Sequence, residues 1–203
     1  MLKVKYKSIV LIFVLSLLSA CMGGGATTPT RYYLVDPVEY SDQSVKAVRP
    51  LSIEILDLHI PQYLERFQIA SRSSESRLMF SDNNQWGENL RKNLLRSMAR
   101  NLSRLLSTID VGTPLNRSSS LPDYRIHIHI EQFEQDIDDK VKLIARWQVL
   151  SGSDSESLGV FGAELESEQT VGREDYDQMI AVMRQLYGEL SERIANSIIA
   201  QEN

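Results

Sequence analysis

The sequence predicts an α+β fold, in which one domain packs an antiparallel or mixed β-sheet with two amphipathic helices. Some segments alternate apolar and polar residues with period two, and two longer segments repeat apolar residues every three or four positions. The composition agrees, because 203 residues with 42% hydrophobic and 24% charged side chains are typical of one folded domain. The formal net charge of -5 argues against a protein that binds nucleic acid by neutralising phosphates.

Two strands are expected before the first helical pattern. Residues 31–35 form a short aromatic and β-branched run, which Asp36 and Pro37 end. Residues 51–60 form the second strand, and Pro61 ends it. The apolar phase of this strand shifts at Leu56, which predicts either a bulge there or a strand buried on both faces.

Two shorter strands and a helix are expected next. Residues 67–70 and 77–80 can pair around a serine-rich turn. We expect Asp82 or Asn83 to cap a helix that begins near Trp86, because apolar residues then recur at helical spacing. The apolar residues are Trp86, Leu90, Leu94, Met98, Leu102, Leu105 and Leu106, and Arg91, Lys92, Arg96, Arg100 and Arg104 between them form a basic outer side.

The second half of the chain predicts a three-stranded meander followed by a long helix. Residues 124–131, 141–149 and 158–169 alternate between apolar and polar side chains. Residues 176–199 then form a helix with Asp175 as its cap. Its apolar stripe consists of Met179, Ile180, Met183, Leu186, Tyr187, Leu190, Ile194 and Ile198.

The first twenty residues read as a targeting segment. Three lysines precede an apolar run over residues 9–18, and Leu18, Ser19, Ala20 and Cys21 follow in order. Ten helical residues span only about 15 Å, against the roughly 30 Å of a bilayer core. The run is therefore too short for a resident transmembrane helix and has the length of the apolar region of a signal peptide.

The sequence Leu18-Ser19-Ala20-Cys21 resembles the bacterial lipobox, and Cys21 is the only cysteine in the chain. The resemblance implies recognition by signal peptidase II through Leu18, Ser19 and Ala20, with diacylglycerol and an N-acyl lipid attached covalently to Cys21. It divides the chain into a signal peptide over residues 1–20, a lipidated tether over 21–30 and a periplasmic domain over 31–203. Met22 follows the cysteine where an aspartate would direct retention in the inner membrane, so we expect the outer membrane.

Candidate chemical groups are few, and each has a structural interpretation. His127 and His129 share one face of an expected strand, about 7 Å apart, but no third metal ligand is near them in sequence and His59 is isolated. The acidic residues Asp138, Asp139, Glu164, Glu166 and Glu168 are interpreted as solvated surface groups. No nucleophile motif or phosphate-binding loop accompanies them. We therefore expect no enzyme activity, no metal and no dissociable cofactor.

The order of motifs resembles the ABC-type transport auxiliary lipoprotein family, which includes paraquat-inducible protein C. The resemblance rests on a lipobox followed by Tyr32-Tyr33-Leu34, a strand that runs into Ile60-Pro61-Gln62-Tyr63-Leu64, a helix with Trp86 and Leu90, Trp147, and a final amphipathic helix. It implies an auxiliary component of intermembrane phospholipid transport that supports outer-membrane integrity. The implied partner is a mammalian-cell-entry domain protein, and the implied attachment to the membrane is through lipid.

The partner contact is expected at Tyr63, Leu64 and Phe67, because these apolar residues fall outside the regular strand and helix patterns. The alternative interpretation is that they cap the hydrophobic core. A homo-oligomer that forms a ring around a tube end is a further possibility. Two other function classes stay open at this point: a lipoprotein subunit of another outer-membrane assembly or secretion machine, and a lipid-tethered periplasmic hydrolase.

Overall fold

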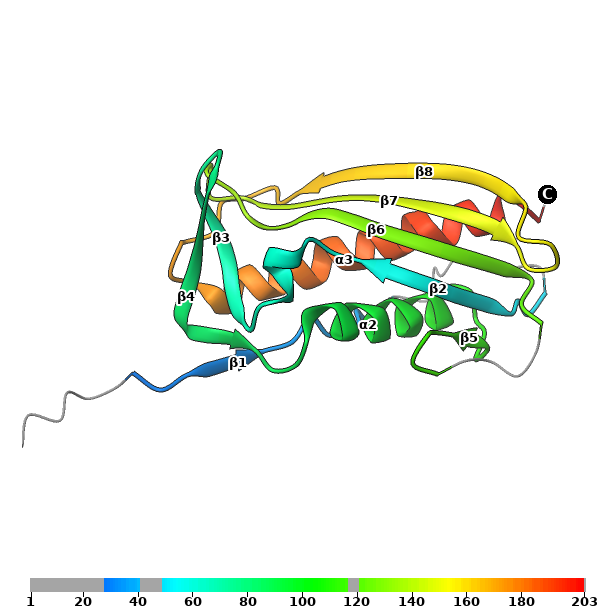
Figure 1. Cartoon of the computed structure of the whole chain (residues 1–203), viewed down its shortest axis with the longest axis horizontal. Coiled ribbons are helices and arrows are strands. Elements are labelled where there is room, and N and C mark those ends of the chain that lie inside the picture. Colours follow the sequence, from blue (N-terminus) through cyan, green and yellow to red (C-terminus); the bar gives the residue numbers. More distant parts are fainter. Residues whose placement is uncertain (1–27, 41–48, 117–120, 203) are drawn as a thin grey trace, which may run out of the picture.

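The computed structural model describes residues 28–40, 49–116 and 121–202. These residues form an open mixed sheet of eight strands with two α-helices, which confirms the predicted α+β class (Figure 1). The elements in chain order are β1 (Arg31–Tyr33), β2 (Ile53–His59), the 3₁₀ turn η2 (Gln62–Glu65), β3 (Gln68–Ser74), β4 (Arg77–Trp86), α2 (Leu90–Leu105), β5 (Val111–Gly112), β6 (Tyr124–Gln135), β7 (Val141–Ser151), β8 (Ser157–Glu166) and α3 (Tyr176–Ile199).

The meander β6–β7–β8, which the alternating patterns predicted, forms one side of the sheet, with β8 as its outer strand. Both pairs are antiparallel, with Ile128 opposite Trp147 and Trp147 opposite Phe161. Along β6 the residues from Tyr124 to Ile130 alternate between buried and exposed positions. One face of the meander therefore packs against the core, and the other faces solvent.

Strand β2 pairs in parallel with the first half of β6, and its predicted irregularity is a bulge. The register skips Leu56, since Ile55 pairs with Ile126 and Asp57 pairs with His127. The bulge moves Leu58 onto the buried face that Ile55 occupied before it. The alternative of a strand buried on both faces is excluded, because Asp57 and His59 are exposed.

The first helix begins later than the sequence predicted, because residues 81–86 continue β4 as a strand. Three residues of β1 pair in parallel with the end of β4, including Tyr33 with Trp86. These pairings give the backbone N–H and C=O groups of residues 84–86 hydrogen-bond partners in place of those that a helix would provide. Asn89 caps α2 instead of Asp82 or Asn83, and its side chain accepts a hydrogen bond from the Lys92 backbone at 3.2 Å.

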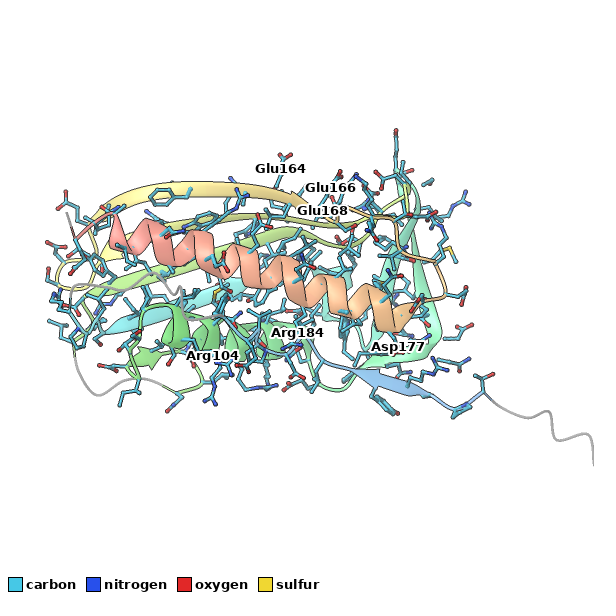
Figure 2. The ribbon with its side chains drawn as sticks, turned by 180° about the vertical axis from the view of Figure 1, so that it is seen from behind. Arg104, Glu164, Glu166, Glu168, Asp177 and Arg184 are labelled. Atoms are coloured by element: carbon cyan, nitrogen blue, oxygen red, sulfur yellow. The ribbon has the colours of Figure 1, made fainter. Side chains whose placement is uncertain are left out.

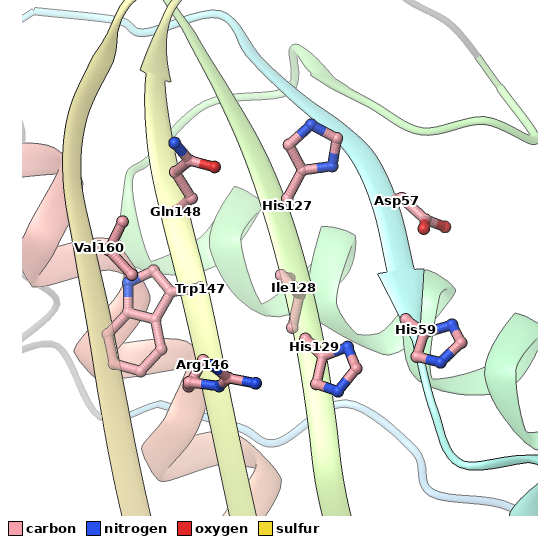
Figure 3. Close-up of a pocket in the computed structure, with 9 residues that line it drawn as sticks. All are labelled: Asp57, His59, His127, Ile128, His129, Arg146, Trp147, Gln148 and Val160. Carbon is pink, nitrogen blue, oxygen red and sulfur yellow. The ribbon is translucent and has the colours of Figure 1, made fainter.

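Both helices cover the same face of the sheet, a point that sequence periodicity left open. In Figure 3, which looks at the opposite face, both helices lie behind the strands. The hydroxyl of Tyr187 on α3 donates to the carbonyl of Leu94 on α2 at 2.8 Å, and the Trp147 indole donates to Ser197 at 2.9 Å. The predicted apolar stripe of α3 is buried throughout, so burial on the sheet fixes the long helix.

Residues 34–40 lie over the helix pair as an extended strap. Asn93, Ser97 and Asn101 recur every four residues on α2 and are all buried. Asn93 accepts from the Val35 backbone N–H at 2.7 Å, and Asn101 accepts from that of Val38 at 3.1 Å. This polar ladder satisfies the strap's backbone groups, which no regular strand partner would reach.

Two arginines hold the other side of the strap. Arg184 of α3 donates to the Pro37 carbonyl at 2.7 Å, and Arg104 of α2 donates to the Val38 carbonyl (Figure 2). Gly188 permits close approach here, because a Cβ atom on it would lie 2.8 Å from Val38. The strap therefore connects β1 firmly to both helices.

Candidate functional site

The segment predicted to contact a partner forms the 3₁₀ turn between β2 and β3. The Leu64 backbone N–H donates to the Pro61 carbonyl at 2.9 Å, which closes the turn. Leu64 is 1% exposed and Phe67 is 62% exposed, while Tyr63 is half-buried. The expectation for Leu64 needs correction, because its side chain belongs to the hydrophobic core and caps it as the alternative interpretation proposed.

Tyr63 is tied to a buried carboxylate on the central strand. Its hydroxyl donates to Oε2 of Glu134 at 2.8 Å, and Glu134 has no exposed side-chain surface. Arg72 of β3 donates to Oε1 of the same carboxylate at 2.7 Å, and the Phe133 backbone N–H donates to Oε2 at 3.0 Å. Burial, followed by the negative charge of Glu134, raises the pKa of Tyr63 well above its ordinary value. The phenol therefore stays protonated and acts as a donor.

A shallow hollow of about 470 Å³ lies beside this turn. It is lined by Gln62, Tyr63, Glu65, Arg66 and Phe80. The Arg66 guanidinium lies 4.5 Å from the centroid of the Phe80 ring, which is a cation–π geometry. The segment thus combines an exposed aromatic ring with a polar hollow, the mixture that is common at protein interfaces.

The open face of the sheet brings His59 together with His127 and His129, which are distant from it in sequence. His59 pairs in register with His129, and their rings stack with centroids 4.9 Å apart (Figure 3). Together with His127, these two rings line a hollow of about 490 Å³, which Asp57 and Arg146 also line. His59 looks isolated in the sequence. The parallel pairing of β2 with β6 places it beside the other two histidines.

The described residues contain no group of three or more histidine, cysteine, aspartate or glutamate side chains with a geometry that could hold a metal ion. Two stacked imidazoles have nearly parallel planes, at 17° to each other. The histidine hollow is a surface feature of the open face.

Most of the acidic residues considered for catalysis are in ion pairs. Lys142 lies 2.6 Å from Asp136 and 3.3 Å from Asp138, and Lys140 lies 2.6 Å from Glu166. Against the opposing effect of burial, hydrogen bonds from Lys142 and from the Ile137 backbone lower the pKa of Asp136. These ion pairs join the β6–β7 turn to β8.

Asp139 is also paired, with Arg173 at 2.7 Å. Glu164 and Glu168 have no ion-pair partner within the described part of the chain, and both lie near the end of β8 (Figure 2). The predicted lipidation residue Cys21 and the recognition residues Leu18, Ser19 and Ala20 lie outside the described residues. None of the helices that the structure describes has the length and apolar content needed to span a bilayer.

The described residues form an α+β domain with an open sheet face and an N-terminal strap. A family model described as the ABC-type transport auxiliary lipoprotein component matches residues 32–195. The chain belongs to this family, which confirms the resemblance drawn from the motifs. It is a family of transport auxiliary components and not a known enzyme family, and its lipoprotein character indicates a membrane-anchored location in the cell envelope.

Solved structures share the fold at low sequence identity. A crystal structure of an uncharacterized protein aligns with a TM-score of 0.63 and 19% identity, covering 84% of this chain and 99% of that chain. Protein XCC0632 from Xanthomonas campestris, of family DUF330, aligns with a TM-score of 0.62 and 15% identity, covering 86% and 95%. A comparison with curated proteins finds no match.

Proposed function

We propose that this chain is the lipid-anchored auxiliary subunit of an intermembrane phospholipid transport system. In this proposal it sits on the periplasmic face of the outer membrane, binds a mammalian-cell-entry domain protein and supports outer-membrane integrity. The observation that carries the proposal is the family match over residues 32–195, directly after the lipobox-like sequence that ends at Cys21.

The proposed anchor is the lipid on Cys21. A single acyl chain gives marginal membrane binding, whereas two or more hold a protein stably at about 0.8 kcal/mol for each buried CH₂. Diacylglycerol together with an N-acyl group would meet this requirement. The anchor would explain how a domain without a membrane-spanning helix among its described residues stays in the envelope.

The tether would limit where the domain can lie. Nine residues lie between Cys21 and Arg31, and an extended chain reaches at most about 35 Å over the ten steps from one to the other. Strand β1 begins at Arg31 and lies beside the lower end of the β3–β4 hairpin (Figure 1). The end of the domain that contains the β3–β4 hairpin would therefore stay near the membrane. The strap contacts both helices and would hold them to this end.

The proposed partner contact is the exposed ring of Phe67 together with the neighbouring hollow. The hydrogen bond from Tyr63 to Glu134 holds this segment in place. Arg66 and Phe80 line the hollow. An exposed aromatic anchor with a polar rim favours protein binding. A ring of copies around the end of the partner's tube would present this surface several times, and closed symmetry would suit that geometry.

Co-purification with the mammalian-cell-entry protein from the same cells tests the proposal. Full-length chain in detergent should retain that partner, and Phe67→Ala should reduce the retained amount about tenfold. Ile109→Ala is the matched control, because Ile109 is 101% exposed and lies between α2 and β5. Absence of the partner from the wild-type preparation would overturn the function, and equal retention by both variants would overturn only the contact surface.

A further inference from the structure

Strand β8 is a long free edge of the sheet. Among the described residues it pairs only with β7, through nine of its ten residues, whereas the other outer strands β1 and β5 contain three and two residues. In Figure 1 no described element runs along its outer side. Natural proteins usually shorten or cover such edges, because unpaired backbone groups recruit another strand.

The register identifies which backbone groups are free. The Ser167 N–H donates to the Val141 carbonyl at 2.9 Å, just beyond the pair of Lys142 with Glu166. Antiparallel pairs alternate between bonded and non-bonded positions. The N–H and C=O groups of Val160, Gly162 and Glu164 therefore point away from β7, toward the open edge.

The side chains along this edge change character from one end to the other. Val160 is 69% exposed and Leu158 is 37% exposed, so the first half of the edge is apolar. Glu164 follows four residues after Val160 on the same exposed face and has no ion-pair partner among the described residues. A strand added here would meet an apolar residue and a carboxylate on one face, with Gly162 between them.

A groove continues the edge on the side of α3. It has a volume of about 380 Å³ and lies between the end of β8 and the helix. Carboxylates of Glu166, Glu168 and Glu189 line it, together with the amides of Gln178 and Gln185. Among these carboxylates, Glu166 is paired with Lys140 and lies 3.9 Å from Lys142, and Glu189 is paired with Arg193, which leaves Glu168 without an ion pair among the described residues. Glu168 therefore extends the negative charge of this edge beyond the end of β8.

We propose that the free edge of β8 binds an extended segment of another protein by strand addition, with a lysine or arginine of that segment beside Glu164. The backbone supplies the hydrogen bonds, and charge complementarity selects a basic segment over a neutral or acidic one. This interaction goes beyond the proposed function, since it needs neither the lipid anchor nor the contact at Phe67.

Hydrogen exchange of the full-length chain in detergent tests this interaction at the level of single amides. The probe is the peptide Thr-Thr-Val-Thr-Thr-Thr-Lys-Thr-Thr, and the control peptide has glutamate in place of lysine. Without peptide, the amides of Val160, Gly162 and Glu164 should exchange quickly, while those of Phe161 and Ala163 are protected by β7. Saturating lysine peptide should slow the three outward amides about tenfold or more, and the glutamate peptide should leave them unchanged.

A proline variant separates edge binding from any other mode. Gly162→Pro removes an outward N–H but no bond to β7, and proline is tolerated at such edge positions. Gly162→Ala is its matched control, because a Cβ atom there would have its nearest neighbour 3.6 Å away. The proline variant should bind the lysine peptide about tenfold more weakly than the alanine variant, with both melting within a few degrees of the wild type.

Three results would overturn the proposal. Equal effects of the two peptides would remove the charge selection, and equal binding by the two glycine variants would remove strand addition. Outward amides that are already protected without peptide, in proportion to protein concentration, would identify a second copy of this chain as the occupant.

Discussion

Loss of one hydroxyl tests whether Tyr63 is a structural link between η2 and the central strand. Tyr63→Phe keeps the ring and removes the hydrogen bond to Oε2 of Glu134. Glu134 would still accept from Arg72 and from the Phe133 backbone, so its carboxylate would not be left unpaired. The cost is therefore that of one hydrogen bond to a charged group.

Such a bond contributes about 1.5–3 kcal/mol to the free energy of unfolding. For a chain of this length, that loss lowers Tm by roughly 3–12 °C. Tyr32→Phe is the matched control, because Tyr32 is 67% exposed, and surface changes of this kind usually stay within about 0.5 kcal/mol.

Urea unfolding followed by tryptophan fluorescence measures the difference, since Trp86 and Trp147 are both buried in the core. A double-mutant cycle with Glu134→Gln adds a stricter test, because residues that share a hydrogen bond should give non-additive costs. A Tyr63→Phe cost below about 0.5 kcal/mol, or strictly additive costs in the cycle, would refute the link between η2 and β6.

Two further predictions follow from other contacts. Asp136 has a lowered pKa in the folded state, so its contribution to stability is complete above the unfolded pKa of about 4 and is lost as pH falls below it; acid titration of unfolding should show a smaller loss below that pH for Asp136→Asn than for the wild type. Gly152→Ala would place a Cβ atom 1.7 Å from the Pro122 carbonyl oxygen, so we expect a cost of about 1–3 kcal/mol or more in the same urea assay. Gly162→Ala should cost far less, and equal costs for the two glycine variants would contradict the steric argument.

Local periodicity predicted the parts of the fold that depend on burial alone. Helix α3 has the predicted bounds and cap, with Asp175 accepting from the Gln178 backbone at 3.0 Å. The bulge at Leu56 could also be predicted, because a change in apolar phase is visible within one strand. In both cases the signal lies within a few residues of the feature.

Features set by distant partners could not be predicted in this way. Trp86 has helical spacing to Leu90, yet pairing of β4 with β1, about fifty residues earlier, keeps it in a strand. Glu134 is 71 positions from Tyr63, so nothing local to the turn identified its partner. The stacking of His59 on His129 likewise follows from strand register and has no local signature.

The mass of the mature N-terminal peptide tests most directly whether this domain functions as a lipid-anchored auxiliary subunit. We expect a peptide that begins at Cys21 and carries the added mass of diacylglycerol and an acyl chain. It also predicts that Cys21→Ser removes this modification and prevents cleavage before residue 21. A mature protein with an unmodified Cys21, or with an N-terminus elsewhere, would contradict the account.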